Sequence, residues 1–419
     1  MSRKFAAVSL GLVVILLGVI AGPVGCGGEK KAETGQFAFG WLQDLTGRAA
    51  FAVKQVYDGV YDYVRMTAEE DPIPGVTIKI VTYDTKSDYS RVPIGYVWLR
   101  GQNATLLSVA AHDSLMLQDR MEQDEWPSLY MSSMPQLQTW EWYWTLYGTS
   151  ASMLESLLEW LREEGWDYSQ GKPKIGALTY AGIVYYEQFC EVTEEVMAQY
   201  PDKYDWQGAQ KAPVGTTAWA YEANALKGCD IILTFLSGTP LASFIKEVRA
   251  RGFTGQFMGP LDSLLAYWGL MKETVPLDQL DGCVSPLSMP HLDETDNVFI
   301  QEVVGYMERY RGKDALDFYR TGTGYQCGWA LGALLVDVVR RAAEQVGAEN
   351  VGDIQGRALR DVIKETNLTI DGWGETLKAR GDLTTLSRVA KMYEYRADVD
   401  KWVSTSDWFV PKSLQVGGE

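Results

Sequence analysis

Strand-like and helix-like segments alternate along most of this chain, and this order restricts its fold more than any single motif does. Residues 37–42 are apolar and aromatic, as in a buried strand, and residues 77–83 are rich in β-branched side chains. From residue 48 to about residue 70, apolar side chains recur at three- and four-residue spacing, which predicts one face of a helix. By the same criteria we expect further strands at 104–109, 129–132, 174–180, 230–236 and 256–260, and further helices at 185–199 and 241–251.

This alternation predicts an α/β protein with parallel sheets that carry helices on both faces. Runs such as Ile231-Ile232-Leu233, which are apolar at every residue, suit strands that are covered on both sides. A chain of 419 residues exceeds one comfortable hydrophobic core, so we expect two doubly wound, Rossmann-like domains. In such sheets, ligands bind where the loops leave the carboxyl ends of the strands.

The N-terminus has the character of an export signal. Arg3 and Lys4 precede an apolar run at 5–21 that is too short to span a bilayer comfortably, and Cys26 follows closely. The arrangement resembles a bacterial lipoprotein signal, which implies a signal peptide at 1–25, acylation of Cys26 and a short tether over 26–35. A single transmembrane anchor is the alternative. In both cases the remaining chain lies outside the cytoplasm, in the periplasm or at the outer face of the cell membrane.

The formal net charge of −17 at pH 7 excludes partners that need a basic surface. Nucleic acid requires Lys and Arg to neutralise its phosphates, and anionic lipid headgroups repel an acidic chain, so a lipid on Cys26 must supply membrane attachment. His112 and His291 are the only histidines, which argues against a His-based metal site, and we expect no metal and no cofactor. The sequence does not decide between two states of the later cysteines: they could form one disulfide or remain four buried free thiols. These cysteines are Cys190, Cys229, Cys283 and Cys327.

Several stretches resemble, in their order along the chain, the leucine/isoleucine/valine-binding protein family. The segment 244–260 is similar to a helix and strand in the second lobe of those proteins. No single stretch is diagnostic, but together they cover about residues 36–405. The other stretches are Asp44-Leu45-Thr46-Gly47, Tyr83-Asp84-Thr85, Trp126-Pro127, Asp281-Gly282-Cys283-Val284, and residues 389–395 and 401–403.

Proteins of this family are type I periplasmic binding proteins, which serve ABC importers. The resemblance implies two α/β lobes with parallel sheets, joined by three crossings, with the ligand enclosed between them. It implies a first lobe at 36–148 and 286–373 and a second lobe at 149–285 and 374–419. It further implies a monomer that is not an enzyme and that delivers a small solute to a membrane permease.

The resemblance also implies where the ligand is held. Family members that bind aliphatic amino acids seat the carboxylate after the third and fourth strands, and hold the ammonium with tyrosines and an acid of the second lobe. That acid falls here on Leu261 or Asp262. His112 and Asp113 depart from the small or hydroxyl residues of the family, and they suit a cationic, amide or hydroxylated ligand. The expected ligand contacts are Ala111, His112, Asp113, Ser133, Met134, Pro135, Gln136, Tyr185, Tyr186, Ser237 and Asp262.

We therefore expect an extracytoplasmic solute-binding protein of an ABC importer. The expected solute is a branched-chain amino acid, another amino acid, an amide or a compound of the urea type. A ligand-sensing receptor domain that acts through a membrane partner is the alternative. A secreted hydrolase is disfavoured, because the sequence has no Gly-x-Ser-x-Gly turn and no obvious nucleophile to pair with either histidine.

Overall fold

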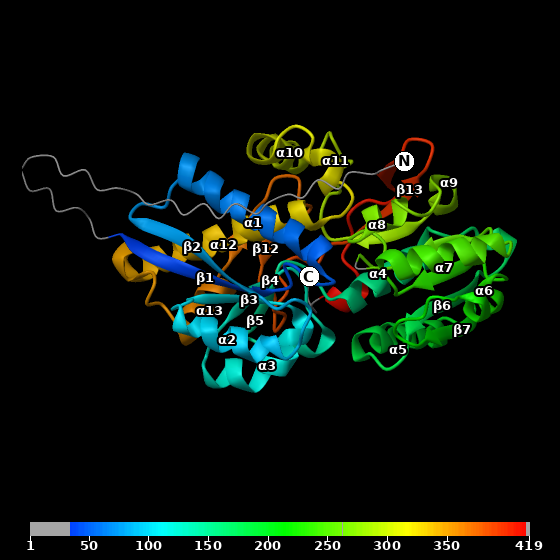
Figure 1. Cartoon of the computed structure of the whole chain (residues 1–419), viewed down its shortest axis with the longest axis horizontal. Coiled ribbons are helices and arrows are strands. Elements are labelled where there is room, and N and C mark those ends of the chain that lie inside the picture. The colour runs from blue at the N-terminus through cyan, green and yellow to red at the C-terminus, as the bar shows by residue number, and fades with distance from the viewer. Residues whose placement is uncertain (1–33, 262, 416–419) are drawn as a thin grey trace, which may run out of the picture. The chain divides into compact units, whose positions relative to one another are not determined.

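A five-stranded parallel sheet forms the centre of the first lobe in the computed structural model, which describes residues 34–261 and 263–415 (Figure 1). Its strands lie in the order β2-β1-β3-β4-β5, and neighbouring strands are parallel throughout. The order reverses between β1 and β3, so the loops after these two strands meet at the switch point of the sheet. The strands are β1 (Gly35–Gln43), β2 (Val76–Asp84), β3 (Leu106–Val109), β4 (Ser128–Tyr130) and β5 (Tyr143–Thr145).

Helices from distant parts of the chain cover this first sheet. Helix α1 packs along α12, and the two appear side by side in Figure 1. Two glycines permit the close approach, because a Cβ on Gly59 would lie 2.2 Å from the Tyr325 carbonyl oxygen and one on Gly328 would lie 2.0 Å from that of Val56. The helices of this lobe are α1 (Ala50–Glu70), α2 (Arg91–Gly101), α3 (Ala111–Gln123), α10 (Val298–Arg311), α11 (Ala315–Tyr319), α12 (Gly324–Val346) and α13 (Gly356–Lys364).

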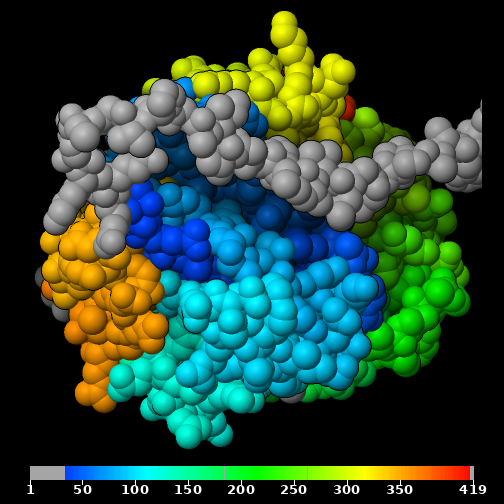
Figure 2. All heavy atoms as spheres, turned by 60° about the vertical axis from the view of Figure 1, so that its left-hand side comes forward, coloured from blue at the N-terminus to red at the C-terminus, as the bar shows by residue number. Residues whose placement is uncertain are grey.

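The surface of the first lobe also joins early and late segments of the chain. In Figure 2, the orange surface near α13 borders the cyan surface of the α2 and α3 region. Arg357 Nε lies 3.0 Å from Glu125 Oε1 and links α13 to the turn after α3. The short strands β11 (Asn367–Leu368) and β12 (Leu377–Lys378) form a separate antiparallel pair that follows α13 in the chain.

A second sheet, of seven strands in the described chain, forms the second lobe in the order β14-β13-β10-β9-β8-β6-β7. The strands β6 to β10 pair in parallel, whereas β13 and β14 add an antiparallel pair at one edge. Its strands are β6 (Lys174–Tyr180), β7 (Asp205–Ala212), β8 (Ile231–Thr234), β9 (Gln256–Met258), β10 (Val284–Leu287), β13 (Lys391–Arg396) and β14 (Lys401–Ser404). Its helices are α4 (Ser150–Glu163), α5 (Val184–Gln199), α6 (Ala220–Leu226), α7 (Gly238–Ala250), α8 (Trp268–Lys272) and α9 (Leu277–Leu280).

The structure confirms the predicted α/β class with two lobes and parallel sheets. Within the described residues the chain passes from one sheet to the other three times, after β5, after β10 and before β13. Strand β6 has the predicted bounds, and Gly252 follows α7 with a φ of 91°, in the left-handed region that favours glycine after a helix. Four predicted strands are shorter than expected, namely β3, β4, β8 and β9, because their last or first residues belong to the loops that flank them.

The four later cysteines are buried as thiols, and the described residues form no disulfide. Burial raises the pKa of Cys190 and of Cys229 to about 11 and that of Cys283 to about 12. Of the two states that the sequence left open, one disulfide or four buried thiols, the structure therefore shows the four buried thiols.

Among residues 34–261 and 263–415, no helix is both long enough and apolar enough to cross a bilayer. The predicted signal peptide at 1–25, the lipidation site Cys26 and most of the tether lie outside the described residues.

Candidate ligand-binding site

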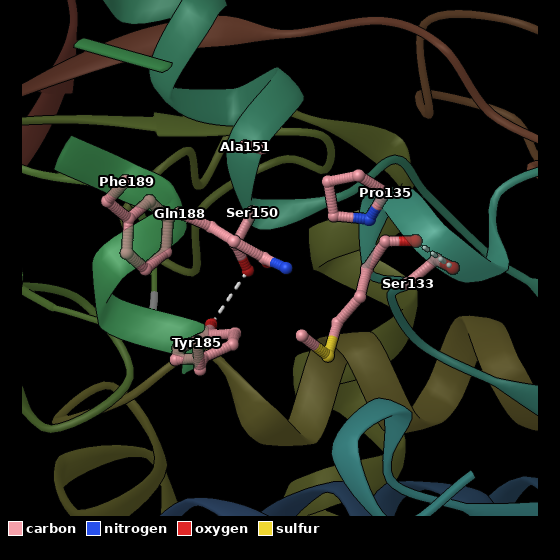
Figure 3. A pocket seen from close by; sticks show the side chains of 8 residues that line it. Ser133, Pro135, Ser150, Ala151, Tyr185, Gln188 and Phe189 are labelled. Atoms are coloured by element: carbon pink, nitrogen blue, oxygen red, sulfur yellow. Dashed lines mark hydrogen bonds between the residues drawn. The ribbon is translucent and has the colours of Figure 1, made fainter. Parts of the chain in front are cut away.

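A small pocket lies where the chain first passes from one sheet to the other, and we call it the interlobe pocket (Figure 3). One side comes from the segment after β4, and the other side comes from the first turns of α4 and α5. Its volume is about 10 Å³, which is about the space needed for one water molecule. The lining residues are Ser133, Met134, Pro135, Ser150, Ala151, Tyr185, Gln188 and Phe189.

Local structure explains why these residues face one another. Thr149 caps α4 by accepting a hydrogen bond from the Ser152 backbone N–H at 2.9 Å, which fixes the first turn of the helix and with it Ser150. Ser133 and Thr149 also form an isolated parallel β-bridge, so the loop after β4 is held beside the start of α4. This backbone contact between the two lobes therefore holds the two sides of the pocket beside each other.

Helix α5 supplies three residues from one of its faces to the same side of the pocket as the start of α4. Tyr185, Gln188 and Phe189 stand at spacings of three and four residues, which places them together on a helix surface. Phe189 is buried, stacks on Phe235 with ring centroids 4.9 Å apart, and meets the ring of Tyr185 edge-on at 5.2 Å. This packing fixes the direction in which Tyr185 points.

Hydroxyl groups and one amide give the pocket its polar character. Ser150 Oγ and Tyr185 Oη lie 2.9 Å apart, as Figure 3 shows, and the Ser133 hydroxyl donates to the Met134 carbonyl oxygen at 3.2 Å. The Gln188 side chain adds an amide beside the apolar surfaces of Met134 and Phe189. The described residues of the wall include no acidic side chain, basic side chain or cysteine, and its polar side chains are three hydroxyls and one amide, which can hold a solute through hydrogen bonds.

The loop between β1 and α1, which begins at the switch point of the first sheet, is held by two aspartates. Asp44 accepts hydrogen bonds from the backbone N–H of Gly47 at 2.5 Å and of Ala49 at 2.8 Å. Asp84, at the end of β2, accepts from the Leu45 N–H at 2.9 Å and the Thr46 hydroxyl at 2.5 Å. Partial burial raises the pKa of Asp84, but these hydrogen bonds outweigh it and hold the pKa below its usual value.

Four of the eleven predicted ligand contacts line the interlobe pocket: Ser133, Met134, Pro135 and Tyr185. Tyr186 packs edge-on against Tyr180 and Tyr185, and Gln136 is exposed. Ser237 stands at the N-cap position of α7 without a side-chain cap, and Asp262 lies outside the described residues.

The remaining predicted contacts, Ala111, His112 and Asp113, form the first turn of α3 and are not part of the pocket wall. His112 is 49% exposed, its ring meets Tyr89 edge-on, and its Nε2 lies 3.1 Å from Asp113 Oδ1. Asp113 is buried in the first lobe. The loop after β3 lies at the switch point of the sheet.

Sequence reasoning did not include Ser150, Ala151, Gln188 and Phe189 in the site. A signal existed for the last two, because they follow Tyr185 by three and four residues on a predicted helix. No comparable signal marks Ser150, whose position depends on where the chain crosses between the sheets. In the described part of the chain, no group of three or more His, Cys, Asp or Glu side chains is placed to hold a metal ion.

Comparison with known proteins adds to this geometry. No curated protein sequence is significantly similar to the chain. A branched-chain amino acid ABC transporter protein from Thermus thermophilus, solved with bound valine, is 15% identical with a TM-score of 0.76, over 91% of this chain and 98% of that one. A branched-chain amino acid transporter substrate-binding protein from Streptococcus pneumoniae, solved with isoleucine, is 13% identical with a TM-score of 0.70, over 90% of this chain and 100% of that one.

A third solved structure has another kind of ligand in its description. The fatty acid ABC transporter substrate-binding protein from Thermomonospora curvata is 14% identical with a TM-score of 0.73, over 90% of this chain and 93% of that one. At such identities these structures share the fold with the chain. The sequence profile of periplasmic binding proteins matches residues 36–399, which is most of the chain. The chain therefore belongs to the periplasmic binding protein family, a family of binding proteins and not of enzymes.

Proposed function

We propose that this protein is the solute-binding component of an ABC importer and captures a small polar solute between its two lobes. The proposed lobes are 36–148 with 286–373, and 149–285 with 374–419. The proposed location is outside the cytoplasm, with a lipid on Cys26 as the anchor. The three solved relatives described above are transporter proteins, which supports this role.

The observation that carries the proposal is the interlobe pocket itself. Ser133 belongs to the first proposed lobe, whereas Ser150 and Tyr185 belong to the second, so a solute in contact with all three touches both lobes. A solute that bridges two lobes stabilises their closed arrangement, which is how a hinged binding protein reports that it is loaded.

The chemistry of the pocket favours a solute with a hydrogen-bonding head and an apolar body. The hydroxyls of Ser150 and Tyr185 and the amide of Gln188 suit a carboxylate or an amide, and Met134 and Phe189 suit an aliphatic part. Valine and isoleucine, which the solved relatives bind, have this character. We infer a solute of the amino-acid or amide type.

Solute entry requires the lobes to separate, because about 10 Å³ holds no amino acid. Two contacts near the start of α1 and α8 support a hinged closure. The Gly269 backbone N–H donates to the Thr321 carbonyl oxygen at 2.7 Å, and the ring of Phe51 stacks on Tyr267 at 6.2 Å. Gly269 and Tyr267 belong to the second proposed lobe, and Thr321 and Phe51 belong to the first.

Calorimetry and thermal unfolding of the mature chain test the proposal. The panel contains leucine, isoleucine, valine, glutamine, urea and octanoate, the last as a probe for a fatty acid. A ligand bound only by the folded protein stabilises it by RT ln(1 + L/Kd), where L is the free ligand concentration, so the melting temperature rises with the logarithm of that concentration once it exceeds Kd. We expect one site per chain for an amino acid or amide. If octanoate alone bound, the proposed solute class would have to change from an amino acid or amide to a fatty acid. If no compound of the panel bound, the proposed function itself would be contradicted.

A matched pair of variants in α5 connects the binding to the pocket. Gln188→Ala removes the amide that lines the pocket, and we expect about tenfold weaker binding, because a polar group left without its partner is costly. Gln199→Ala truncates the exposed last residue of the same helix and should leave binding unchanged. Equal affinities of the two variants would place the solute elsewhere.

A further inference from the structure

Helix α2 carries an apolar face that the rest of the described chain leaves open to solvent. Ile94 is 59% exposed, Val97 is 51% exposed and Trp98 is 40% exposed, and we call these three side chains the α2 face. Their spacing of three and four residues places them together on one side of the helix. Among the large apolar side chains that are exposed in residues 34–261 and 263–415, these are the only ones that share one helix or strand.

The rest of α2 is apolar as well. Residues 92–99 contain no charged side chain, and Val92, Tyr96 and Leu99 are buried on the side that packs on the first sheet. Figure 1 shows α2 and α3 on the side of this sheet that lies away from α1 and α12. A helix at a free surface normally carries polar residues on its outer side, whereas a helix that is apolar all round is normally covered. The outer side of α2 therefore has the composition of a contact surface.

Aromatic rings and arginines border the α2 face. The Trp98 ring lies 5.7 Å from the Tyr83 ring, and the Arg91 guanidinium lies over the same tyrosine at 5.3 Å. At the other end of the helix, Arg100 is 49% exposed and pairs with Asp124. Trp and Tyr favour the boundary between hydrocarbon and water, and Arg lays its stem along apolar surface while its guanidinium stays in water. This combination suits the boundary of a lipid bilayer.

The start of the chain favours a bilayer over a second protein as the occupant of this face. In the proposed function Cys26 carries the lipid, and the chain from there to Gly35 spans at most about 30 Å. Strand β1 begins at Gly35, and the Thr105 backbone N–H, shortly after α2, donates to the Ala38 carbonyl oxygen at 2.7 Å. The C-terminal end of α2 thus lies beside the beginning of β1, and a lipid on Cys26 keeps the α2 face within reach of the membrane.

We propose that the α2 face is a membrane contact, through which the anchored protein rests on the boundary between headgroups and hydrocarbon. This inference rests on the lipid at Cys26 that belongs to the proposed function. The lipid supplies the attachment, and the α2 face sets the orientation of the first lobe on the bilayer. A second copy of the chain is the competing occupant of the face.

Fluorescence quenching on vesicles tests the contact. The mature chain with its lipid on Cys26 is placed in phosphatidylcholine vesicles that contain a doxyl-labelled lipid as the quencher. A nitrobenzoxadiazole label is attached at Ile94→Cys or, as the control, at Tyr221→Cys on α6 of the second lobe. The label goes to the new cysteine because the native thiols at 190, 229, 283 and 327 are buried. We expect quenching at residue 94 at least about threefold stronger than at residue 221, and equal quenching at the two positions would overturn the proposal.

Two further measurements separate the ways in which the proposal can fail. A mature chain whose mass shows no lipid on Cys26 would overturn both this contact and the proposed anchor, whereas solute binding in the interlobe pocket is measured by calorimetry and does not depend on either. In the absence of vesicles, the label at residue 94 should stay accessible to iodide at all protein concentrations. Protection that grows with protein concentration would assign the α2 face to a second copy of the chain and reject the membrane contact.

A charge placed on the α2 face provides a matched pair of variants. Trp98→Glu puts a carboxylate at the bilayer boundary and should reduce the quenching of the label at residue 94 at least about threefold. Tyr221→Glu places the same charge on the second lobe and should leave the quenching unchanged. Both side chains are exposed, so both variants should keep the fold, which circular dichroism checks. Quenching in Trp98→Glu as strong as in the parent chain would exclude the α2 face from the membrane contact.

Discussion

Tyr185 Oη lies 2.9 Å from Ser150 Oγ, and this contact ties the first turn of α5 to the first turn of α4 at the edge of the interlobe pocket. Both helices belong to the second lobe, so the contact shapes one wall of the pocket independently of the other lobe. The wall is therefore expected to be present before the solute arrives.

Tyr185→Phe should weaken solute binding while it lowers the free energy of unfolding by only about 1 kcal/mol, the usual value of one hydrogen bond. The ring stays in place against Phe189, so the change isolates the hydroxyl. Tyr200→Phe is the control, because it keeps the ring under the Arg162 guanidinium at 4.1 Å. Calorimetry and urea unfolding measure both quantities, and unchanged solute affinity in Tyr185→Phe would remove the hydroxyl from the site.

Arg311→Ala should destabilise the protein by about 3–5 kcal/mol, because it leaves the buried Asp62 carboxylate without its cation and leaves the buried Asp58 with Lys54 alone. Arg311 Nε lies 2.6 Å from Asp62 Oδ2, and its Nη1 lies 3.3 Å from Asp58 Oδ1. Arg309→Ala, two residues earlier on α10, removes exposed ion pairs with Glu69 and Glu70 and should change the stability far less. Similar urea midpoints for the two variants would contradict this difference in burial.

Gly328→Ala should prevent the close packing of α1 on α12. The added Cβ would lie 2.0 Å from the Val56 carbonyl oxygen, and backbone atoms cannot yield as a flexible side chain does. We expect a loss of more than about 3 kcal/mol, in the range of severe overpacking. Gly305→Ala in α10 meets no atom within 4 Å and should stabilise the protein by about 0.5–1 kcal/mol. Thermal unfolding should move the two melting temperatures in opposite directions.

The stability of the protein should fall on acidification partly through Asp293. Burial raises the pKa of this carboxyl, but hydrogen bonds and charges from His291, Trp402 and Arg320 outweigh it and hold the pKa well below its usual value. A carboxyl with a depressed pKa in the folded state contributes stability above its unfolded pKa of about 3.9, and this stability is lost as the pH falls below that value. Its contribution is therefore complete at neutral pH.

Urea unfolding of the wild type and of Asp293→Asn at several pH values between neutral and strongly acidic measures this contribution. The variant should be less stable at neutral pH, and the difference should shrink as the pH falls below about 4. A difference that stays constant over this range would mean that the loss comes from packing and not from the charge.

The sequence predicted the central strands and the order of elements, because fully apolar runs such as Ile231-Ile232-Leu233 have few alternatives to a covered strand. It did not predict β7, which pairs only with β6 and carries a polar sequence, Asp205-Trp206-Gln207-Gly208-Ala209-Gln210-Lys211-Ala212. Gly208 adopts a φ of 87° where the pairing with β6 shifts register, so the alternation that marks a strand is interrupted there.

The sequence predicted those residues of the candidate site whose position depends on a single segment of the chain. It did not predict the residues that reach the site only because two distant segments come together. Ser133 and Tyr185 follow directly from positions after a strand and at a helix start, and they line the pocket. Ser150 was missed because a crossing of the chain and a bridge between Ser133 and Thr149 bring it there. Ala111 and His112 were expected in the site from the resemblance, but they lie in the first turn of α3 and are not part of the wall of the interlobe pocket.

The hydrogen bond from Gly269 to Thr321 involves only main-chain atoms, so of all substitutions only proline at position 269 removes its donor directly. Its geometry depends on the missing side chain of Gly269, since a Cβ there would lie 2.6 Å from Thr321 Cβ and 3.1 Å from the Phe51 ring. A single methyl group at this position would therefore push α8 away from Thr321 and Phe51 and keep the two proposed lobes slightly apart. In the proposed closure, residue 269 would thus control how tightly the two lobes approach each other, although it lies outside the lining of the interlobe pocket.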